Sequence, residues 1–450
     1  MYVLPVKTRA IITQIPAPVD NVTHTLIGLI AGESAAAETS AAGLTAQARR
    51  ALSVAVAVIG SNSPDLDLLM SYGAPGNLGY ALWHRGYTHT VLGCLALALL
   101  LYGGAEAFMR YRQLVPSRRD RRLLFAVALF STGLHLVMDY LNSYGVHPFW
   151  PVANRWSYGD SVFIVEPLYW VAAAPLLFWL RTRLARALFG SALLAVLAIG
   201  AWTRLLTPAS CALVALGAPA LAFAGKRLAL RGAARLAVAL ALAVTSIFVL
   251  AAHAASSRAA ALARGAFPED RTLDRVLTPL PSNPLCWDLI LVTTHADRYL
   301  ARHAMLALTP GILKAHSCPA MRAEEHTAPL TAVAAADSDG VRWFGEYRIS
   351  RSEFASRVAM SCEARAFMLF ARAPFLADSA GSAAARSVSA ATTAADEPAP
   401  GRASVLGDLR FDRGQGRGSF EVTIEPLKKL QNCPRAAPWI APRADLAPAR

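Results

Sequence analysis

Six runs of apolar residues, each long enough to cross a lipid bilayer, constrain this chain more than any other feature of its sequence. A bilayer-spanning helix needs about 20 apolar residues. Two shorter, alanine-rich runs come first, at 23–38 and 50–63, and either can form a re-entrant or half-inserted helix packed against protein. The sequence therefore predicts a polytopic α-helical membrane bundle of six to eight apolar helices. The six longer runs lie at 90–109, 122–142, 162–180, 187–204, 208–225 and 234–254.

The apolar character stops near residue 255, which predicts two domains. Charged residues make up only 16% of the 450-residue chain, whereas a soluble domain has about 25%. We therefore expect residues 1–255 to be embedded in the membrane and residues 265–450 to form a smaller soluble domain.

Basic residues gather in short loops between the apolar runs, at Arg49–Arg50, 110–122, 181–186 and 226–235. Such loops mark the cytoplasmic side of a membrane. The remaining connections and everything after residue 255 then lie outside the cytoplasm, so the second domain is predicted to be extracytoplasmic. This distribution accounts for the net charge of +14 and argues against nucleic acid as a partner.

Alternation of aromatic or β-branched residues with polar ones predicts strands in the outer domain, at 341–350, 364–372, 404–411 and 419–426. The fold expected there is β-rich or α+β. Between these strands, the low-complexity stretch near 376–404 is poor in large apolar residues and is predicted to be disordered. The tail from residue 434 has a similar composition and carries the same prediction.

The six cysteines divide between the two domains. Cys94 and Cys211 lie in apolar runs and are expected to be inert core residues. An oxidising outer compartment favours at least one disulfide among the other four, whose three alternative pairings stay open. No CxxC spacing is present, which argues against a zinc ribbon. These four are Cys286, Cys318, Cys362 and Cys433.

Ionisable residues near apolar spans are costly and indicate function. The segment HLVMD places His135 and Asp139 four residues apart, on one face of a helix. An imidazole and a carboxylate so placed can bind a divalent ion. A structural His–Asp hydrogen bond inside the bundle is equally compatible with this motif alone.

The segment SNSPDLDLL contributes Asp65 and Asp67. Ser63 as N-cap and Pro64 at the first helical position would explain acidic residues in a first turn without any metal. Taken alone, the motif favours that structural interpretation, although it explains Asp65 better than Asp67.

The segment HRGYTHT contributes His84 and His89, which need the turn at Gly86 to act together, and Thr88 can cap the next helix. Arg85 is suited to holding a phosphate or carboxylate group of a substrate. A purely interfacial role is the weaker interpretation here.

His24 begins the first apolar run, and a lone histidine there would be structural. The predicted topology nevertheless makes His24 a candidate ligand, because the alternation of helix directions brings it to the same outer face as the other motif residues. Three or more His and Asp ligands with an open position are what a catalytic metal site needs. The predicted metal ligands are His24, Asp67, His84, His89, His135 and Asp139, with Asp65, Asp67 and Arg85 as catalytic residues and Glu33, Asn142, His147 and Asp160 as second-rank candidates.

The motifs TH…G, PDLD, HRGYTH and HLVMDYLNSYG, in this order, resemble the YdjM-type family of bacterial inner-membrane proteins over about residues 20–170. In the outer domain, LPSNPLCWDLI and GDLRF resemble longer members. The resemblance implies a metal-dependent hydrolase in the bacterial inner membrane, with the His and Asp residues above at its centre. The motif order is also similar to that of zinc-dependent phospholipase C and single-strand-specific nucleases. A further His-x-x-x-Asp/Glu pair of those enzymes is absent, so one or two ions are expected rather than three.

The leading hypothesis is a membrane-embedded hydrolase with one or two divalent ions, zinc being favoured by imidazole ligands. Asp65 or Asp67 would orient the attacking water, and Arg85 would hold an anionic group. A site at the outer membrane face predicts an amphiphilic, lipid-like substrate such as a phosphoester in a lipid head group. A transporter or ion-binding protein is the second hypothesis, although transporter sites lie near the bilayer midplane. A non-catalytic scaffold is the third, and the oligomeric state stays open.

Overall fold

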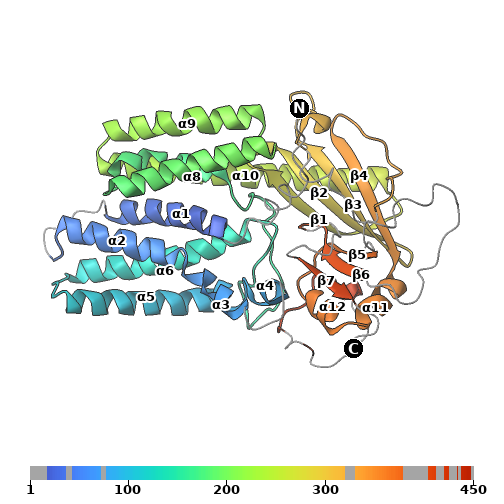
Figure 1. The fold of residues 1–450 in the computed structure, drawn as a ribbon, viewed down its shortest axis with the longest axis horizontal. Helices are drawn as coiled ribbons and strands as arrows, with labels where there is room; N and C mark the ends of the chain where they lie inside the picture. The colour runs from blue at the N-terminus through green and yellow to red at the C-terminus, as the bar shows by residue number, and fades with distance from the viewer. Residues whose placement is uncertain are drawn as a thin grey trace, which may run out of the picture.

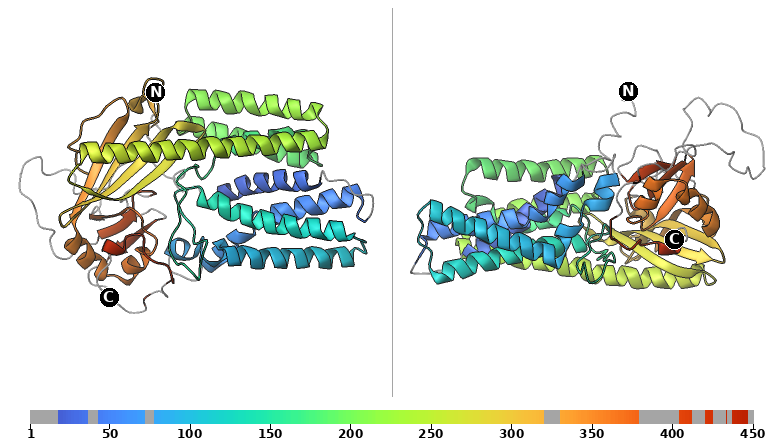
Figure 2. Two further views of the ribbon diagram at one scale, coloured as in Figure 1. Left: turned by 180° about the vertical axis from the view of Figure 1, so that it is seen from behind. Right: turned by 90° about the horizontal axis from the view of Figure 1, so that it is seen from below.

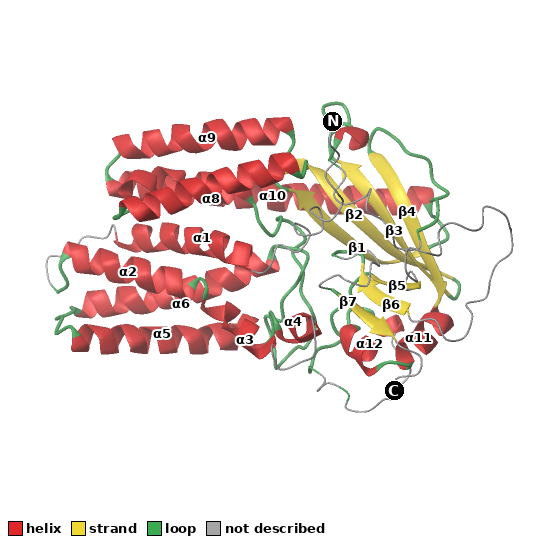
Figure 3. Ribbon diagram, in the orientation of Figure 1, coloured by secondary structure: helices red, strands yellow, loops and turns green. Residues whose placement is uncertain are grey.

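A computed structural model describes residues 18–36, 43–71, 78–319, 330–378, 404–411, 420–424, 433 and 437–446. The chain forms a helical bundle and, at one end of it, a domain built mainly of strands (Figures 1 and 3). The last helix of the bundle ends at Ala266, and the first strand begins at Arg271.

The bundle contains five helices, within the described part of the chain, that are long and apolar enough to cross a membrane. They are α5 (Val91–Tyr111), α6 (Arg118–Tyr140), α8 (Arg183–Trp202), α9 (Pro208–Arg227) and α10 (Leu230–Ala266). The predicted count of six to eight is therefore not confirmed. Shorter helices complete this half: α1 (Pro18–Ala36), α2 (Ala46–Gly60), α3 (Leu68–Ser71), α4 (Leu78–Trp83), α7 (Pro167–Ala173) and the 3-10 helices η2 (Ser63–Asp67), η3 (Tyr87–His89) and η4 (Ala174–Trp179).

The run at 162–180, predicted as a full span, forms only the short helix α7 and its continuation η4. Pro167 starts α7, and Pro175 lies at the start of η4. Proline cannot donate the backbone hydrogen bond that a continuing α-helix requires, and its ring crowds the preceding turn. The apolar run therefore folds inside the bundle without forming a long helix.

The strand-rich domain, for which we keep the name outer domain from its predicted location, contains two antiparallel sheets, ordered β1-β2-β3-β4 and β5-β6-β7 in the described residues. Two short helices, α11 (Arg351–Ala359) and α12 (Cys362–Phe367), follow the first sheet. The strands are β1 (Arg271–Leu280), β2 (Asn283–His295), β3 (Arg298–Ala307), β4 (Val341–Ser350), β5 (Pro374–Asp378), β6 (Ser404–Asp408) and β7 (Glu421–Ile424).

The sequence predicted β4 and stretches that contain β6 and β7, but it missed β1, β2, β3 and β5. Most of β2 is buried, so it shows little of the alternation by which a half-buried strand is recognised. The helix α10 extends beyond the bundle along this sheet (Figure 2). Its Ala255 and Ala259 belong to one buried cluster with Trp287 and Leu289 of β2, while Ile290 of the same strand belongs to another.

The prediction of a strand at 364–372 is wrong, because the segment begins inside α12 and continues as a turn. The Ser361 side chain accepts a hydrogen bond from the Ala364 amide, which caps the helix. Phe367 and Phe370, three residues apart, are both buried, as helical spacing allows.

The insertion predicted as disordered near 376–404 falls mainly outside the described residues, and its first residues belong to β5. The prediction for the tail is wrong over residues 437–446, where the side chain of Trp439 is buried against the bundle. Its indole nitrogen donates a hydrogen bond to the Leu82 carbonyl at 2.9 Å. One large aromatic side chain therefore orders a segment whose composition resembles that of a disordered chain.

The cysteines follow the division expected between the domains. Disulfides join Cys286 to Cys318 and Cys362 to Cys433, while Cys94 and Cys211 are free. The structure thereby selects one of the three pairings that the sequence left open.

Candidate metal centre

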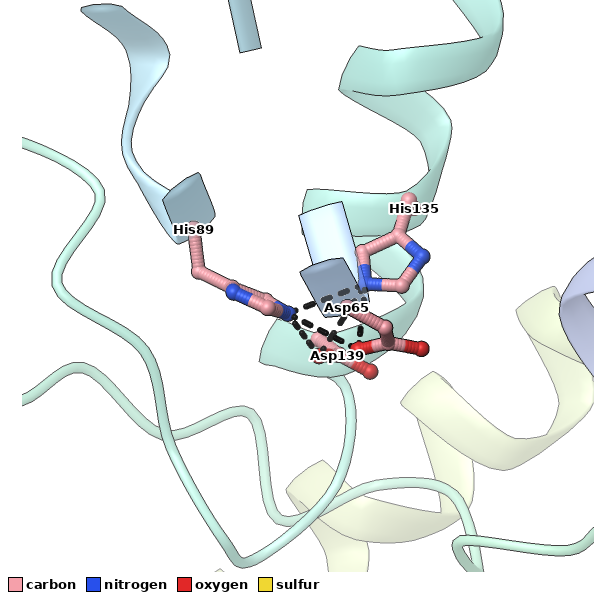
Figure 4. Close-up of side chains that lie close together, drawn as sticks. All are labelled: Asp65, His89, His135 and Asp139. Carbon is pink, nitrogen blue, oxygen red and sulfur yellow. Dashed lines mark hydrogen bonds and ion pairs between the residues drawn. The ribbon is translucent and has the colours of Figure 1, made fainter. Parts of the chain in front are cut away.

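Four side chains from three elements meet where the bundle contacts the outer domain (Figure 4). Asp65 comes from η2, His89 from η3, and His135 and Asp139 from the last turns of α6. The Nε2 atoms of His89 and His135 lie 3.0 Å apart, and Asp65 Oδ1 lies 3.4 Å from each of them. Asp139 Oδ2 is 3.1 Å from Nε2 of His89 and 3.5 Å from Nε2 of His135. We call these four residues the metal cluster.

The spacing within the metal cluster fits a tetrahedral ion. Four ligand atoms at bond lengths of about 2.0–2.1 Å from zinc are roughly 3.3 Å from one another by tetrahedral geometry. The separations of 3.0–3.5 Å between the nitrogen atoms and between nitrogen and oxygen atoms lie around that value. The donor set, two imidazoles and two carboxylates, is also one that divalent transition metals accept.

The outer nitrogen of each imidazole has an acceptor that orients the ring. His135 Nδ1 lies 2.7 Å from the Ser61 carbonyl, to which it can only donate, and His89 Nδ1 lies 3.0 Å from Asp67 Oδ2. Donation from both Nδ1 atoms leaves a lone pair on each Nε2, facing the other across 3.0 Å. A cation between them relieves this repulsion, so the arrangement is one that metal sites use.

Asp67 lies beside the metal cluster and serves several partners. Its carboxylate contacts His84 Nδ1 at 3.0 Å and accepts a hydrogen bond from the Thr88 hydroxyl at 2.8 Å, besides the contact with His89. With Asp65 and His84, it also forms a second group of donor atoms close enough to share an ion. Asp67 can therefore orient His89 or help to hold a second ion.

The carboxylates Asp65 and Asp67 are held in their ionised form, which favours binding of a cation between them and the histidines. Burial raises the pKa of Asp67, but His89 and His84 outweigh burial and hold this pKa well below its usual range. Burial also raises the pKa of Asp65, and again the histidines, here His135 and His89, hold it below the usual range. Both carboxylates stay ionised, which suits them to bind a cation.

His24, from α1, lies against the cluster. Its Nε2 is 3.2 Å from Asp139 Oδ1, and its ring stacks on that of His135 at 4.0 Å between centroids. His24 therefore contacts the carboxylate oxygen that does not face His89. The predicted convergence of His24 with the later motifs is present in the fold.

Arg85 has partners other than those expected from the sequence. Its Nε lies 2.9 Å from Asp139 Oδ2, and its NH1 group donates to Asn142 Oδ1 at 2.8 Å. Arg85 is only 1% exposed, and its backbone φ of 59° is a value that residues other than glycine rarely adopt. This geometry favours a role in holding Asp139 over the predicted contact with substrate, and it brings the second-rank candidate Asn142 next to the cluster.

The other three second-rank candidates do not reach the metal cluster. Glu33 lies toward the opposite end of α1, where both its carboxylate oxygens accept hydrogen bonds from Arg50 at 2.8 Å. Asp160 pairs with Arg372 of the outer domain at 2.7 and 2.8 Å. His147 lies between the rings of Trp156 and Trp439, and burial lowers its pKa to about 3, which keeps it neutral.

Sequence reasoning missed several residues around the cluster. Thr90, not Thr88, caps α5 by accepting a hydrogen bond from the Gly93 amide, which leaves Thr88 for Asp67. Ser63 does not cap η2, because Asn62 occupies the N-cap position. The Ser61 carbonyl and the Trp439 side chain carried no signal in the sequence, since their contacts join distant segments.

Comparison with known proteins finds a family model that matches the first part of the chain. The model of the family described as YdjM inner membrane protein matches residues 19–209. The uncharacterized protein YfhP of Bacillus subtilis (strain 168) is 24% identical over 153 residues, which are 34% of this chain and 43% of that protein. The match thus spans less than half of the relative's length. No solved structure matches the chain.

The matched segment includes every predicted metal ligand, from His24 to Asp139, together with Asp65 and Arg85. With its apolar helices, the chain is an inner-membrane protein. The resemblance seen in the sequence motifs is therefore confirmed over residues 19–209, which match the YdjM inner membrane protein family.

Proposed function

We propose that this protein is a membrane-embedded, metal-dependent hydrolase and that the metal cluster is its active site. The observation that carries the proposal is the pair of Nε2 atoms of His89 and His135, 3.0 Å apart, each on a ring whose other nitrogen has an acceptor. Two carboxylates complete a set of four donors. The match to the YdjM family agrees with a membrane setting for this chemistry.

A divalent ion held by these residues would supply Lewis acidity toward a water molecule and a scissile bond. Zinc is the ion we propose, because imidazole nitrogen and carboxylate oxygen in tetrahedral spacing suit it. His89, His135 and Asp139 would serve as the three ligands and leave the fourth position open for water. Asp65 is the most exposed of the four residues, at 8%, and would be the carboxylate that accepts a proton from that water. Asp139, held by Arg85, would keep the geometry of the site constant.

An amphiphilic substrate, such as a phosphoester of a lipid head group, fits the position of the cluster. His135 and Asp139 lie in the last turns of the apolar helix α6, at the end of the bundle where the outer domain packs. Large apolar side chains next to Asp65 and Asp67 are exposed, namely Leu66, Leu69 and Met70. A lipid tail could lie along such side chains while its head group reaches the carboxylates.

A structural or stored ion is the second candidate function. Its support is the burial of His89, His135 and Asp139, none of which is more than 1% exposed. Such a protein would bind metal tightly without turnover, so the two functions differ in activity and share the metal site.

Elemental analysis of the purified protein tests the metal site. We expect about one or two divalent ions per chain in the parent and almost none after His135→Ala or Asp139→Ala, because each change removes a ligand. His253→Ala is the control, since this exposed histidine on α10 bonds to its own helix at the Val249 carbonyl. Equal, near-zero metal in the parent and all variants would leave only the scaffold hypothesis.

Reporter fusions test the side of the membrane. A reporter that works only outside the cytoplasm should be active when fused after Gly265 and silent after Arg119, because the basic loops favour the cytoplasm. The reverse pattern would place the metal cluster at the cytoplasmic face and remove the proposed outer-face substrate.

A further inference from the structure

We propose that the outer domain controls the metal cluster, with Arg410 and Trp439 acting as positioning residues for the ligand Asp139. The inference rests on the proposed metal site and concerns how that site is regulated. Both residues lie more than 250 positions after Asp139 in the chain, yet a short series of contacts connects them to it.

Arg410 joins the outer domain to the loop that follows α6. Its NH1 group donates to the carbonyls of Ser143 and Tyr144 at 2.8 and 3.2 Å. Its Nε and NH2 groups are held by the Asp408 carboxylate at 2.8–3.1 Å, and NH2 also donates to the Phe370 carbonyl at 3.0 Å. The Arg410 side chain is 1% exposed, so it is a fixed part of the domain contact.

The loop held by Arg410 in turn holds Arg85. The Tyr144 amide and the Arg85 guanidinium both donate to Asn142 Oδ1, at 2.9 and 2.8 Å. The guanidinium also lies over the Tyr144 ring, 4.7 Å from its centroid. From there Arg85 reaches Asp139 Oδ2 at 2.9 Å, the oxygen that faces the histidines of the cluster.

Trp439 secures the same turn from another direction. It donates to the Leu82 carbonyl and stacks on His147 at 3.9 Å, and His147 Nδ1 lies 3.3 Å from the Arg85 carbonyl. A Cβ atom on Gly86 would lie 3.2 Å from the Trp439 ring, so the indole packs closely on the turn. Trp439 and Arg410 therefore act on Arg85 through separate contacts.

Arg85 needs such support because of its backbone. A non-glycine residue with positive φ persists only where its surroundings hold it, and here the surroundings include two segments of the outer domain. If those contacts are lost, we expect Arg85 to relax and Asp139 to lose its ion pair with the Arg85 guanidinium. Coupling of this kind is reciprocal, so metal binding should also stabilise the docked outer domain.

The test measures zinc affinity by chelator competition and the visible spectrum of the cobalt-substituted protein. Arg410→Ala and Trp439→Ala should each lower zinc affinity about 10–100-fold, the typical effect of losing an outer contact of a ligand. Each should also change the cobalt spectrum, because the geometry around the ion changes. Arg410→Lys should not restore the parent values, since one ammonium cannot span Asp408 and three carbonyls.

Arg342→Ala is the matched control, because Arg342 lies on β4 of the same domain and packs on Phe344. It should keep the parent affinity and spectrum. Detection of the Cys286–Cys318 and Cys362–Cys433 bonds in each variant shows that the outer domain has folded. Trp439→Phe, which keeps the stacking and loses the donor, gives a milder variant with an expected intermediate affinity.

The outcomes separate this inference from the proposed function. Parent protein that binds no zinc or cobalt overturns both. Parent protein that binds metal, with unchanged affinity and spectrum in folded Arg410→Ala, Trp439→Ala and Trp439→Phe, overturns control by the outer domain and leaves the metal site intact. Lower affinity with an altered spectrum in these variants alone supports the inference.

Discussion

The two ends of the helical bundle both bury carboxylates, but they surround them with different chemistry. At the end with the basic loops, Asp120 accepts hydrogen bonds from Arg49 Nε at 2.7 Å, from the Leu44 amide at 3.0 Å and from Ser117. At the same end, Glu33 accepts hydrogen bonds from the Nε and NH2 groups of Arg50. Asp120 and Glu33 are therefore each neutralised by an arginine that donates hydrogen bonds to the carboxylate.

At the end next to the outer domain, which we call the outer end, the carboxylates meet imidazoles that turn their acceptor nitrogens inward. Asp65 and Asp139 face Nε2 atoms whose rings already donate from the other side. The comparison shows that burial alone does not distinguish a structural acid from a metal ligand. The distinguishing feature is whether permanent donors saturate the carboxylate or leave its oxygens facing other acceptors.

Removing the carboxylate at the basic end should have the largest effect on stability. Asp120→Ala would leave Arg49 buried without its partner, and breaking a buried pair costs about 3–5 kcal/mol. We expect thermal unfolding in detergent to show this loss, with unchanged metal content in the folded fraction. Glu106→Ala is the control, because its partner Arg121 is 41% exposed and such pairs contribute less than about 1 kcal/mol. Loss of bound metal in folded Asp120→Ala would contradict the separation of the two ends.

Glu166 represents a third environment, because it is buried and its hydrogen-bond donors, from Leu168 and Ser282, are neutral. It accepts hydrogen bonds from the Ser282 amide at 3.0 Å, from the Ser282 hydroxyl at 3.2 Å and from the Leu168 amide at 3.0 Å. Burial raises the pKa of Glu166 from 4.5 to about 7. The folded protein therefore keeps a proton on Glu166 that the unfolded chain has lost between these pH values.

Stability should accordingly fall as pH rises from 4.5 to 7, and the contribution of Glu166 should level off above that. The expected loss is up to about 3 kcal/mol. Thermal unfolding of metal-free protein at pH 5 and pH 8 measures it, and Glu166→Gln should be less sensitive to pH than the parent. Identical pH dependence in the two proteins would show that Glu166 is not buried as a neutral acid.

The smallest expected effect concerns Asp67, which lies between the two kinds of environment. If it orients His89, Asp67→Asn should lower zinc affinity about 10–100-fold and leave binding measurable by chelator competition. Glu33→Gln, at the basic end, should leave the affinity unchanged. Complete loss of metal in Asp67→Asn would instead identify Asp67 as a direct ligand, as the sequence motifs first indicated.

The sequence predicted apolar helices and the motifs of the candidate site where the signal is local. Apolar length identifies α5, α6, α8, α9 and α10, because a helix able to cross a bilayer needs about 20 consecutive, mostly apolar residues. The spacing of His135 and Asp139 follows from helix geometry alone. The strands β2 and β3 escaped prediction, because a strand covered on both faces has no alternating pattern.

The amino-acid sequence by itself determined which residue types gather at the outer end, since the turns and helix directions bring the motifs with His24, Asp65, His89 and His135 to one place. Only the tertiary structure decided the role of each residue. Three features depend on contacts between segments tens to hundreds of residues apart. They are the partners of Arg85, the acceptors that orient the two imidazole rings, and the packing of Trp439 against the bundle. Hydrogen bonds act over about 3 Å, so the chemistry of a buried site depends on packing that no local pattern encodes.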